Sequence, residues 1–345
     1  MLGLSSGLMY EGFVSEDVTP TVLTINDCVA WYDFTDTTTM WQDGNPSSGH
    51  PYFNQLPPAD PVASDGDDID RIYNKVWTLL ETKNALGKYL SGSNADYKIG
   101  GANGHSYVTL NGAGSRLNSG LGGNGGVGDV IDEEWDGDQT VDLSAYKGTW
   151  PLSESTINLA AFTIFLVADP KHRDGRAFSI FGDKEDNNDS SRKEFHLYYD
   201  KYNSASGSYK IDCYDGSTNT TISSGTSGKS DNLHIVTGVL SGSGDSQLYR
   251  DGDNTDGTTS ASSGSGSIDI THSNPDIYEK ENRIIIGRNM NLGSISDTTA
   301  GVSPNWDWGN QSDDRIYEII CYNRELTSEE LSTIETHLKE KYDIS

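Results

Sequence analysis

The stretch Arg315-Ile-Tyr-Glu-Ile-Ile-Cys-Tyr322 decides the fold of this chain. Its residues alternate with a period of two, which is typical of a β-strand and places Tyr317, Ile319 and Cys321 on one face. The opposite face then carries Ile316, Glu318, Ile320 and Tyr322. Because both faces are largely apolar, we expect a strand that is covered on both sides.

A helix is predicted directly after this strand, with Thr327 as its N-cap. The Thr327 side chain can accept a hydrogen bond from the Glu330 backbone while the Glu330 side chain reaches back, and Leu326 can pack on Leu331. The apolar stripe of the helix comprises Leu331, Ile334, Leu338 and Tyr342. The chain is therefore expected to end on a short amphipathic helix that packs on a sheet.

Working outward, the composition favours many short strands joined by turns. Only 34% of the 345 residues are hydrophobic, and 38 are glycines. Strand patterns occur at residues 22–34, 106–111, 160–168, 177–181, 194–199, 209–213, 233–240, 247–249 and 283–286. Clusters of Gly, Asp, Asn and Ser separate them, and this spacing is typical of an all-β sandwich or jelly roll.

The charge of the chain restricts its partners. Lys and Arg number 24 against 52 acidic residues, which gives a formal net charge of −28. Such a charge argues against nucleic-acid binding and favours solubility. No apolar stretch is long enough to span a membrane. Three cysteines, Cys28, Cys213 and Cys321, each lie in an apolar or alternating run, so we expect buried free thiols.

The N-terminal segment, residues 1–21, is treated apart from the domain that we expect at residues 22–345. It carries no charge before Glu11 and has neither a basic start nor a long apolar run, so we expect no secretory signal and no membrane anchor. Its apolar anchors are Leu2, Leu4, Leu8, Met9 and Phe13. Two interpretations stay open, a frayed terminus or a peptide that docks into a partner protein.

Loop insertions are expected at about residues 38–70, 112–158 and 252–282, and the first of them ends in an acidic turn. Asp65, Asp67, Asp68 and Asp70 are spaced around a glycine, as at the start of a calcium-binding loop. No bidentate glutamate follows at the required distance. The sequence is therefore compatible with bound Ca²⁺ or with a solvated acidic turn.

Residues 69–80 fit two patterns. Ile69, Ile72, Tyr73 and Val76 match a helical stripe, whereas the run from residue 71 to residue 77 also matches an extended strand. The periodicity does not decide between them.

Two further groups are candidates for sugar chemistry. Glu133, Glu134, Asp136 and Asp138 supply carboxylates of the kind that cleave glycosidic bonds, but they lie between flexible loops instead of on a rigid strand. Trp306 and Trp308 could offer ring faces to a sugar or partner, or clamp the structure.

The order of six segments resembles the laminin G-like branch of the concanavalin A-like lectin/glucanase superfamily. The most specific motifs are Tyr-x-Asp-Gly at residues 249–252 and the terminal run at residues 318–330. The segments are Val29-Ala-Trp-Tyr-Asp-Phe34, Phe162-Thr-Ile-Phe-Leu-Val-Ala168, His234-Ile-Val-Thr-Gly238, Leu248-Tyr-Arg-Asp-Gly252, Ile284-Ile-Ile-Gly287 and Arg315-Ile-Tyr-Glu-Ile-Ile-Cys-Tyr322.

This resemblance implies a concanavalin A-like antiparallel jelly roll in which the first and last strands are adjacent. It favours an extended structure for residues 71–77. The acidic Glu-x-Asp-x-Glu strand of the glucanases is absent, and no calcium ligand carries over to a matching position.

The opening segment followed by such a domain is also similar to virion structural proteins of tailed, often marine, bacteriophages. This implies a non-enzymatic protein of the virion surface, made in the host cytoplasm, whose N-terminus docks to a capsid, tail or fibre protein. It could form a homo-oligomer, and its concave sheet or rim loops could bind cell-surface glycans. The alternatives are an independent carbohydrate-binding module and a glycoside hydrolase.

Overall fold

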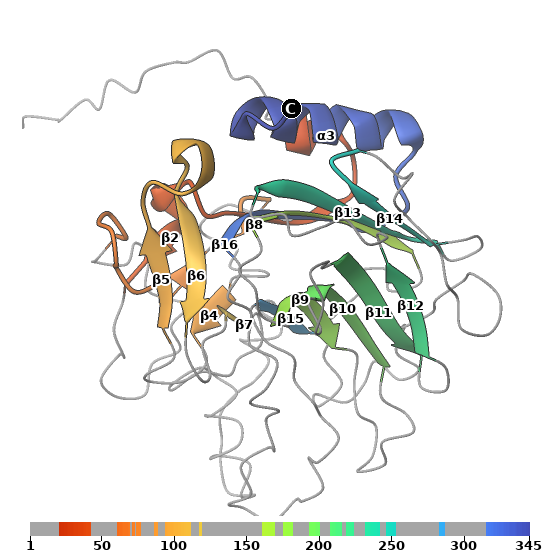
Figure 1. The fold of residues 1–345 in the computed structure, drawn as a ribbon, viewed down its shortest axis with the longest axis horizontal. Coiled ribbons are helices and arrows are strands. Elements are labelled where there is room, and N and C mark those ends of the chain that lie inside the picture. Colours follow the sequence, from red (N-terminus) through yellow and green to blue (C-terminus); the bar gives the residue numbers. More distant parts are fainter. Residues whose placement is uncertain are drawn as a thin grey trace, which may run out of the picture.

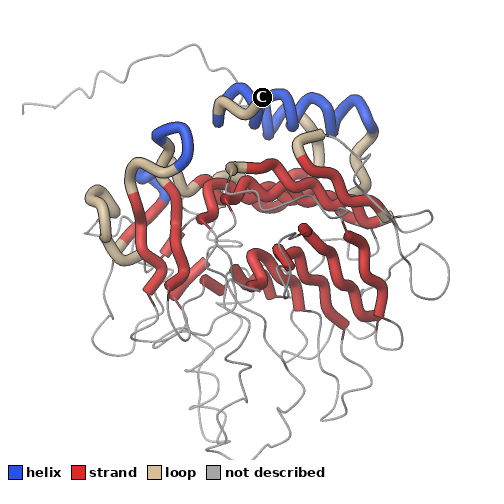
Figure 2. The backbone as a smooth tube through the Cα atoms, viewed as in Figure 1, coloured by secondary structure: helices blue, strands red, loops and turns tan. Residues whose placement is uncertain are grey.

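The computed structural model describes residues 21–42, 61–69, 71–72, 74–76, 86–88, 94–111, 117–118, 161–169, 175–181, 193–200, 208–215, 219–223, 232–241, 246–252, 283–286 and 315–345. These residues form two antiparallel sheets packed face to face, with a long helix outside one of them (Figure 1). Figure 2 shows that strands dominate the described backbone. The predicted jelly-roll β-sandwich with a C-terminal helix is confirmed.

The first sheet, sheet A, is built around the C-terminal strand β16. Its order is β14-β13-β8-β16-β6-β5, and β1 shares one edge of β16 with β6. The first and last strands are thus adjacent, as the resemblance implied. Its strands are β1 (Cys28–Asp33), β5 (Asn94–Lys98), β6 (Tyr107–Asn111), β8 (Phe162–Asp169), β13 (His234–Leu240), β14 (Gln247–Arg250) and β16 (Arg315–Tyr322).

In the part of the chain that the structure describes, the second sheet, sheet B, has nine strands in the order β12-β11-β10-β9-β15-β7-β4-β3-β2. Its strands are β2 (Met40–Trp41), β3 (Arg71–Ile72), β4 (Leu86–Lys88), β7 (Leu117–Asn118), β9 (Gly175–Phe181), β10 (Lys193–Asp200), β11 (Ser208–Asp215), β12 (Asn219–Ser223) and β15 (Arg283–Ile286). Two 3-10 turns, η1 (Thr37–Thr39) and η3 (Ala102–Gly104), complete the described connections.

The main core lies between the two sheets. The ring of Phe162 in sheet A meets that of Phe195 in sheet B edge-on, with centroids 4.9 Å apart. Gly238 on β13 permits a close approach, because a Cβ there would lie 2.8 Å from Cδ1 of Ile211 on β11. Cys213 and Cys321 are buried free thiols, as predicted, and Cys28 is a half-buried one.

The outer face of sheet A is covered by α3 (Ser328–Tyr342) and by the short α1 (Thr21–Thr24), as Figure 1 shows for α3. The predicted capping box between Thr327 and Glu330 is present. Leu326 joins this second core, whose helical members are Leu331, Ile334, Leu338 and Tyr342. Both faces of β16 are therefore buried.

The strict alternation predicted for β16 is wrong at Tyr317. A β-bulge interrupts the pairing with β8 between Ile316 and Glu318. Ile316, Ile319 and Cys321 face sheet B, whereas Tyr317 packs under α3 with Ile320 and Tyr322. A bulge adds one residue to one strand, which shifts the pattern by one position. Consequently Tyr317 and Glu318 both belong to the helix-facing side.

Other differences are local. The strand expected at residues 22–34 begins only at Cys28, because residues 21–24 form α1. The helical alternative for residues 69–80 is not found in the described part, where Arg71–Ile72 is extended and residues 75–76 form a turn. Strands β2, β4, β5, β7 and β12 were not predicted, because each is short and has at most two apolar residues. Among the described residues, no helix is long and apolar enough to cross a membrane.

Candidate functional site

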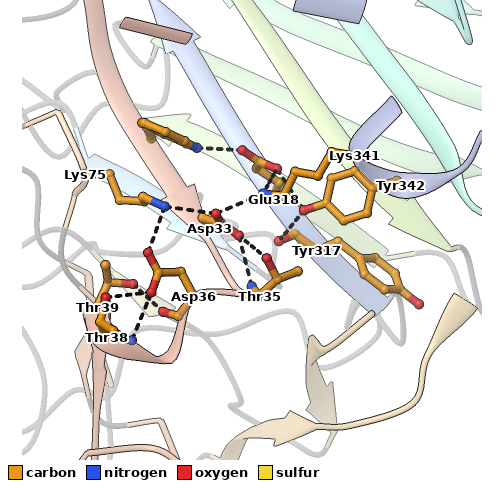
Figure 3. Close-up of polar contacts among 11 residues, drawn as sticks. Asp33, Thr35, Asp36, Thr38, Thr39, Lys75, Tyr317, Glu318, Lys341 and Tyr342 are labelled. Carbon is orange, nitrogen blue, oxygen red and sulfur yellow. Dashed lines mark hydrogen bonds and ion pairs between the residues drawn. The ribbon is translucent and has the colours of Figure 1, made fainter. Parts of the chain in front are cut away.

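A cluster of charged side chains lies between the outer face of sheet A and α3 (Figure 3). Asp33 at the end of β1 pairs in register with Glu318 on β16. Both residues are almost completely buried, with exposures of 4% and 0%. Glu318 lies on the helix-facing side of β16 together with Ile320 and Tyr322, and the bulge adds Tyr317 to the same side. The fold thus places two carboxylates side by side beneath a helix.

Glu318 is held by three donors. The indole Nε1 of Trp31 donates to its Oε1 at 2.6 Å. The ammonium of Lys341 donates to its Oε2 at 2.7 Å, and the Tyr342 hydroxyl donates to the same oxygen at 2.8 Å. A buried carboxylate requires such partners, because its desolvation is otherwise very costly. Two of these donors come from the last turn of α3.

Asp33 shares Lys341 with Glu318. The Lys341 ammonium lies 2.9 Å from Oδ2 of Asp33, and the Lys75 ammonium lies 3.0 Å from the same oxygen. Thr35 donates to Oδ1 from both its backbone N–H and its hydroxyl, at 3.0 Å and 2.6 Å. Lys75 also pairs with Asp36 at 2.8 Å. Two lysines therefore balance the buried carboxylates.

The position of Lys75 follows from Asn74, which is 3% exposed. The Asn74 amide accepts from the Trp31 N–H and donates to the Val29 carbonyl, both at 2.8 Å. The Lys75 N–H donates to the Trp31 carbonyl at 2.9 Å. Residues 74–76 thereby bond to the edge of β1 that does not pair with β16. Lys75 then places its ammonium 4.4 Å from the centroid of the Trp31 ring.

The electrostatics of the cluster suit ion pairs that hold α3 on sheet A. Burial raises the pKa of Asp33, but Lys341, Lys75 and the Thr35 hydroxyl outweigh burial and bring it down to about 2. Burial and the adjacent Glu318 raise the pKa of Tyr342. A general acid needs a pKa near the working pH. The pKa of Asp33 is far below that range, so its carboxylate is suited to staying charged in an ion pair and not to proton transfer.

A second polar cluster explains the Asp-Gly motif that follows β14. Asp251 accepts from the Ile235 N–H at 2.8 Å, and its other oxygen lies 2.6 Å from Nδ1 of His234. Asp251 and Gly252 both have positive φ, 54° and 80°, and form a tight turn directly after β14. The positive φ of Gly252 favours glycine, and a Cβ there would also lie 2.8 Å from the carboxylate of Glu335 on α3, whose side chain would have to shift.

The predicted acidic turn is partly described. Asp65 accepts from the Ile99 N–H at 2.9 Å. Asp67 accepts from the Ala63 and Ser64 N–H groups at 2.9 Å and 2.7 Å. The Asp67 contacts stabilise the turn itself, and the Asp65 contact joins the turn to the residue that follows β5. Within the described part of the chain, no group of three or more His, Cys, Asp or Glu is arranged to hold a metal. Calcium binding at Asp65, Asp67, Asp68 and Asp70 stays a prediction.

The other predicted site residues lie outside the described residues, so the structure does not test them. They are Leu2, Leu4, Leu8, Met9, Phe13, Asp70, Glu133, Glu134, Asp136, Asp138, Trp306 and Trp308.

The outer face of sheet B carries a different set of side chains. Phe195, Leu197 and Tyr199 of β10 point into the core. Since strand residues alternate, His196 and Tyr198 belong to the opposite face. Tyr198 pairs in register with Lys210 on β11, and both are half-buried. An aromatic ring beside an ammonium suits contact with a sugar, by stacking and by hydrogen bonding.

Sequence patterns did not reveal the charged cluster. Glu318 interrupts an otherwise apolar strand, and a lone carboxylate in a strand covered on both sides requires a buried partner. The sequence therefore indicates that Glu318 has a buried partner. It does not indicate which residues are the partners, because Lys75 and Lys341 lie far away in the sequence.

Comparisons with known proteins give a fold-level likeness only. No family model matches the chain, and no curated protein matches it. A native heptameric SAP-like pentraxin from Limulus polyphemus is 16% identical over 51% of this chain and 70% of that chain, with a TM-score of 0.34. The CBM40 of the Ruminococcus gnavus IT-sialidase, bound to α2,3-sialyllactose, is 17% identical over 56% of this chain and 90% of that chain, with a TM-score of 0.35.

A GH54 α-L-arabinofuranosidase is 13% identical over 90% of this chain, with a TM-score of 0.44, and this chain spans 62% of that enzyme. A Trypanosoma rangeli sialidase is 12% identical over 72% of this chain, with a TM-score of 0.35, and this chain spans only 30% of it. At these identities and TM-scores, the likenesses carry no argument about activity or ligand.

Proposed function

We propose that this chain is a non-enzymatic virion structural protein. In this proposal a lectin-like domain is displayed at the particle surface, and the N-terminal segment, residues 1–21, docks to another virion protein of the capsid, tail or fibre. The apolar anchors of that segment and the net charge of −28 support it, because like charge keeps crowded copies soluble.

The position of α1 is the observation that carries the proposal. Val22 of α1 is fully buried in the core beneath α3, and its carbonyl accepts from the Tyr322 hydroxyl at 2.8 Å. Thr21, the first described residue, therefore lies on the α3 side of sheet A. The polar outer face of sheet B is on the opposite side of the sandwich. A domain docked through residues 1–21 would present that polar face away from its anchor.

Mass spectrometry of particles purified free of host debris tests this proposal. We expect the chain in stoichiometric amounts, and its loss from particles when Leu4, Leu8 and Phe13 are replaced by serine. The matched control replaces Ser5 and Ser6 by alanine and should leave incorporation unchanged. Purified particles that lack the chain would refute the virion assignment.

A carbohydrate-binding module that acts independently is the second candidate, and the outer face of sheet B favours it. A glycan array with the purified chain, with and without added calcium, tests this function. We expect Tyr198→Ala to abolish any glycan signal. Thr333→Ala, on the exposed side of α3, should leave it unchanged. A signal that survives Tyr198→Ala would exclude this face as the binding surface.

A further inference from the structure

The tip of the hairpin between β5 and β6 lies against the C-terminal end of α3. The side-chain amide of Asn103 donates to the Tyr342 carbonyl at 2.6 Å and to the Asp343 carbonyl at 3.2 Å. The ring of His105 packs edge-on against Tyr342, with centroids 4.9 Å apart. Asn103 thus caps the end of a helix from a distant part of the chain.

This cap depends on the amide group. The last carbonyls of a helix have no partner within the helix, and the helix dipole makes that end negative. An amide supplies donors there. A carboxylate in its place would have no proton to donate and would be repelled by the same carbonyls. Replacing the amide by an acid therefore converts an attraction into a repulsion.

The surroundings of Asn103 also permit its amide to be converted chemically to an acid. Asn103 is exposed, and Gly104 follows it. Asn103 has a φ of 52° and Gly104 has a φ of 83°, so the turn uses a conformation that glycine adopts readily. A glycine places no Cβ in the way of a reaction between its own nitrogen and the preceding side chain.

We propose that Asn103 is a site of spontaneous deamidation, and that the docking of α3 controls the reaction. The Gly104 nitrogen loses its proton to solvent base and attacks Cγ of Asn103. The bond from Cγ to Nδ2 breaks, and Nδ2 takes a proton from solvent and leaves as ammonia. The resulting cyclic imide is opened by one water molecule, which gives aspartate or isoaspartate. No oxidant or reductant is involved.

In the docked state both reacting groups are engaged in hydrogen bonds. The Gly104 N–H donates to the Gly101 carbonyl at 3.2 Å, while the Asn103 amide is engaged by α3. The turn must leave α3 before the nitrogen can reach Cγ. Hydrogen bonds of this kind lower the open fraction by roughly 5- to 30-fold. The product cannot restore the cap, so each reaction makes the loss of the cap permanent.

The experiment measures conversion of Asn103 by peptide mass spectrometry, with the full chain kept at mildly alkaline pH. The native chain should convert roughly 5- to 30-fold more slowly than the chain in denaturant. In the denatured chain, the Asn-Gly pairs at residues 111–112 and 124–125 serve as internal references for the rate of conversion. Equal rates in the native and denatured chain, or no conversion in denaturant, would overturn the proposal.

Two variants distinguish control by α3 from general exposure. Asp343 closes α3 with a φ of 53°, so Asp343→Gly should strengthen the helix end and slow conversion. Lys341→Met removes a contact of the last turn and should speed conversion. Both rates should follow the hydrogen exchange of the Ile344 N–H, which donates to the Lys339 carbonyl. Rates that are the same in all three proteins would refute the coupling.

A direct mimic supplies a readout that does not depend on the reaction rate. Asn103→Asp should increase hydrogen exchange at Ile344, whereas Asn103→Gly, which removes the cap without adding charge, should increase it less. Unchanged exchange in Asn103→Asp would show that the amide does not hold α3.

Discussion

Lys341→Met tests whether the charged cluster fastens α3 to sheet A. Lys341 lies between two buried carboxylates, 2.7 Å from Glu318 and 2.9 Å from Asp33. Methionine keeps most of the length and the apolar stem of lysine, so the substitution removes chiefly the charge. After the change, Glu318 stays fully buried and its ammonium partner is gone.

The structure sets the expected size of the effect. Removing one partner of a buried ion pair usually costs about 3–5 kcal/mol, because the remaining charge is left in a poorly solvating environment. Here Glu318 keeps the donors of Trp31 and Tyr342, and Asp33 keeps Lys75. We therefore expect the lower end of that range, a loss of about 3 kcal/mol in the free energy of unfolding.

Equilibrium unfolding in urea, followed by circular dichroism, measures this loss. The matched control is Lys98→Met, which breaks a more exposed pair with Asp96 at 3.7 Å and should cost less than about 1 kcal/mol. The double variant Lys341→Met with Glu318→Gln removes both charges and should recover more than half of the loss. If Lys341→Met costs no more than Lys98→Met, the cluster does not stabilise the helix.

Three further outcomes are expected. The pKa of Asp33, about 2, lies below its ordinary value, so its stabilisation is present above about pH 4 and is lost as the pH falls through 2. Urea unfolding at a series of pH values should show this slope, and Asp33→Asn should remove it. Burial raises the pKa of Glu335, so its charge opposes folding at neutral pH although Thr237 donates to it. Glu335→Gln should raise the melting temperature at neutral pH, by an amount that shrinks on acidification, and a lower melting temperature would contradict this. Gly238→Ala places a methyl group 2.8 Å from Ile211 and should lower the free energy of unfolding by about 1–3 kcal/mol through overpacking. Urea unfolding measures this loss, and an unchanged midpoint would show that the two sheets can move apart enough to accept the methyl group.

The parts of the fold that sequence predicted are those set by neighbouring residues. The capping box of α3 needs only Thr327 and Glu330, and its buried stripe needs only the helical period. The buried strand β8 is recognisable from its apolar run alone. Each of these features is local, so the sequence contains all the information that determines it.

Features that depend on contacts between distant segments were missed. The bulge at Tyr317 belongs to the pairing of β16 with β8, and nothing in either strand alone specifies it. The charged cluster joins β1, the turn at residues 74–76, β16 and α3, so its composition depends on the tertiary fold. Strand β5 pairs with β6 on one edge and bonds to the backbone of Asp67 and Ile69 on the other, and its two apolar residues alone do not specify either partner.

The two faces of the sandwich differ in how deeply their polar side chains are buried. On the α3 side, the buried carboxylates of Asp33 and Glu318 are matched by lysines, a tyrosine and an indole, and the end of the helix is capped by Asn103. Each of these polar groups already contributes to stability, so changing one costs folding free energy. On the outer face of sheet B, Tyr198 and Lys210 are only half-buried, and none of the described helices covers them. Half-buried residues remove less surface from water than buried ones, so a substitution at Tyr198 or Lys210 should cost less folding free energy than one in the charged cluster. Sequence changes are therefore better tolerated on the outer face of sheet B, while the α3 side keeps the fold closed.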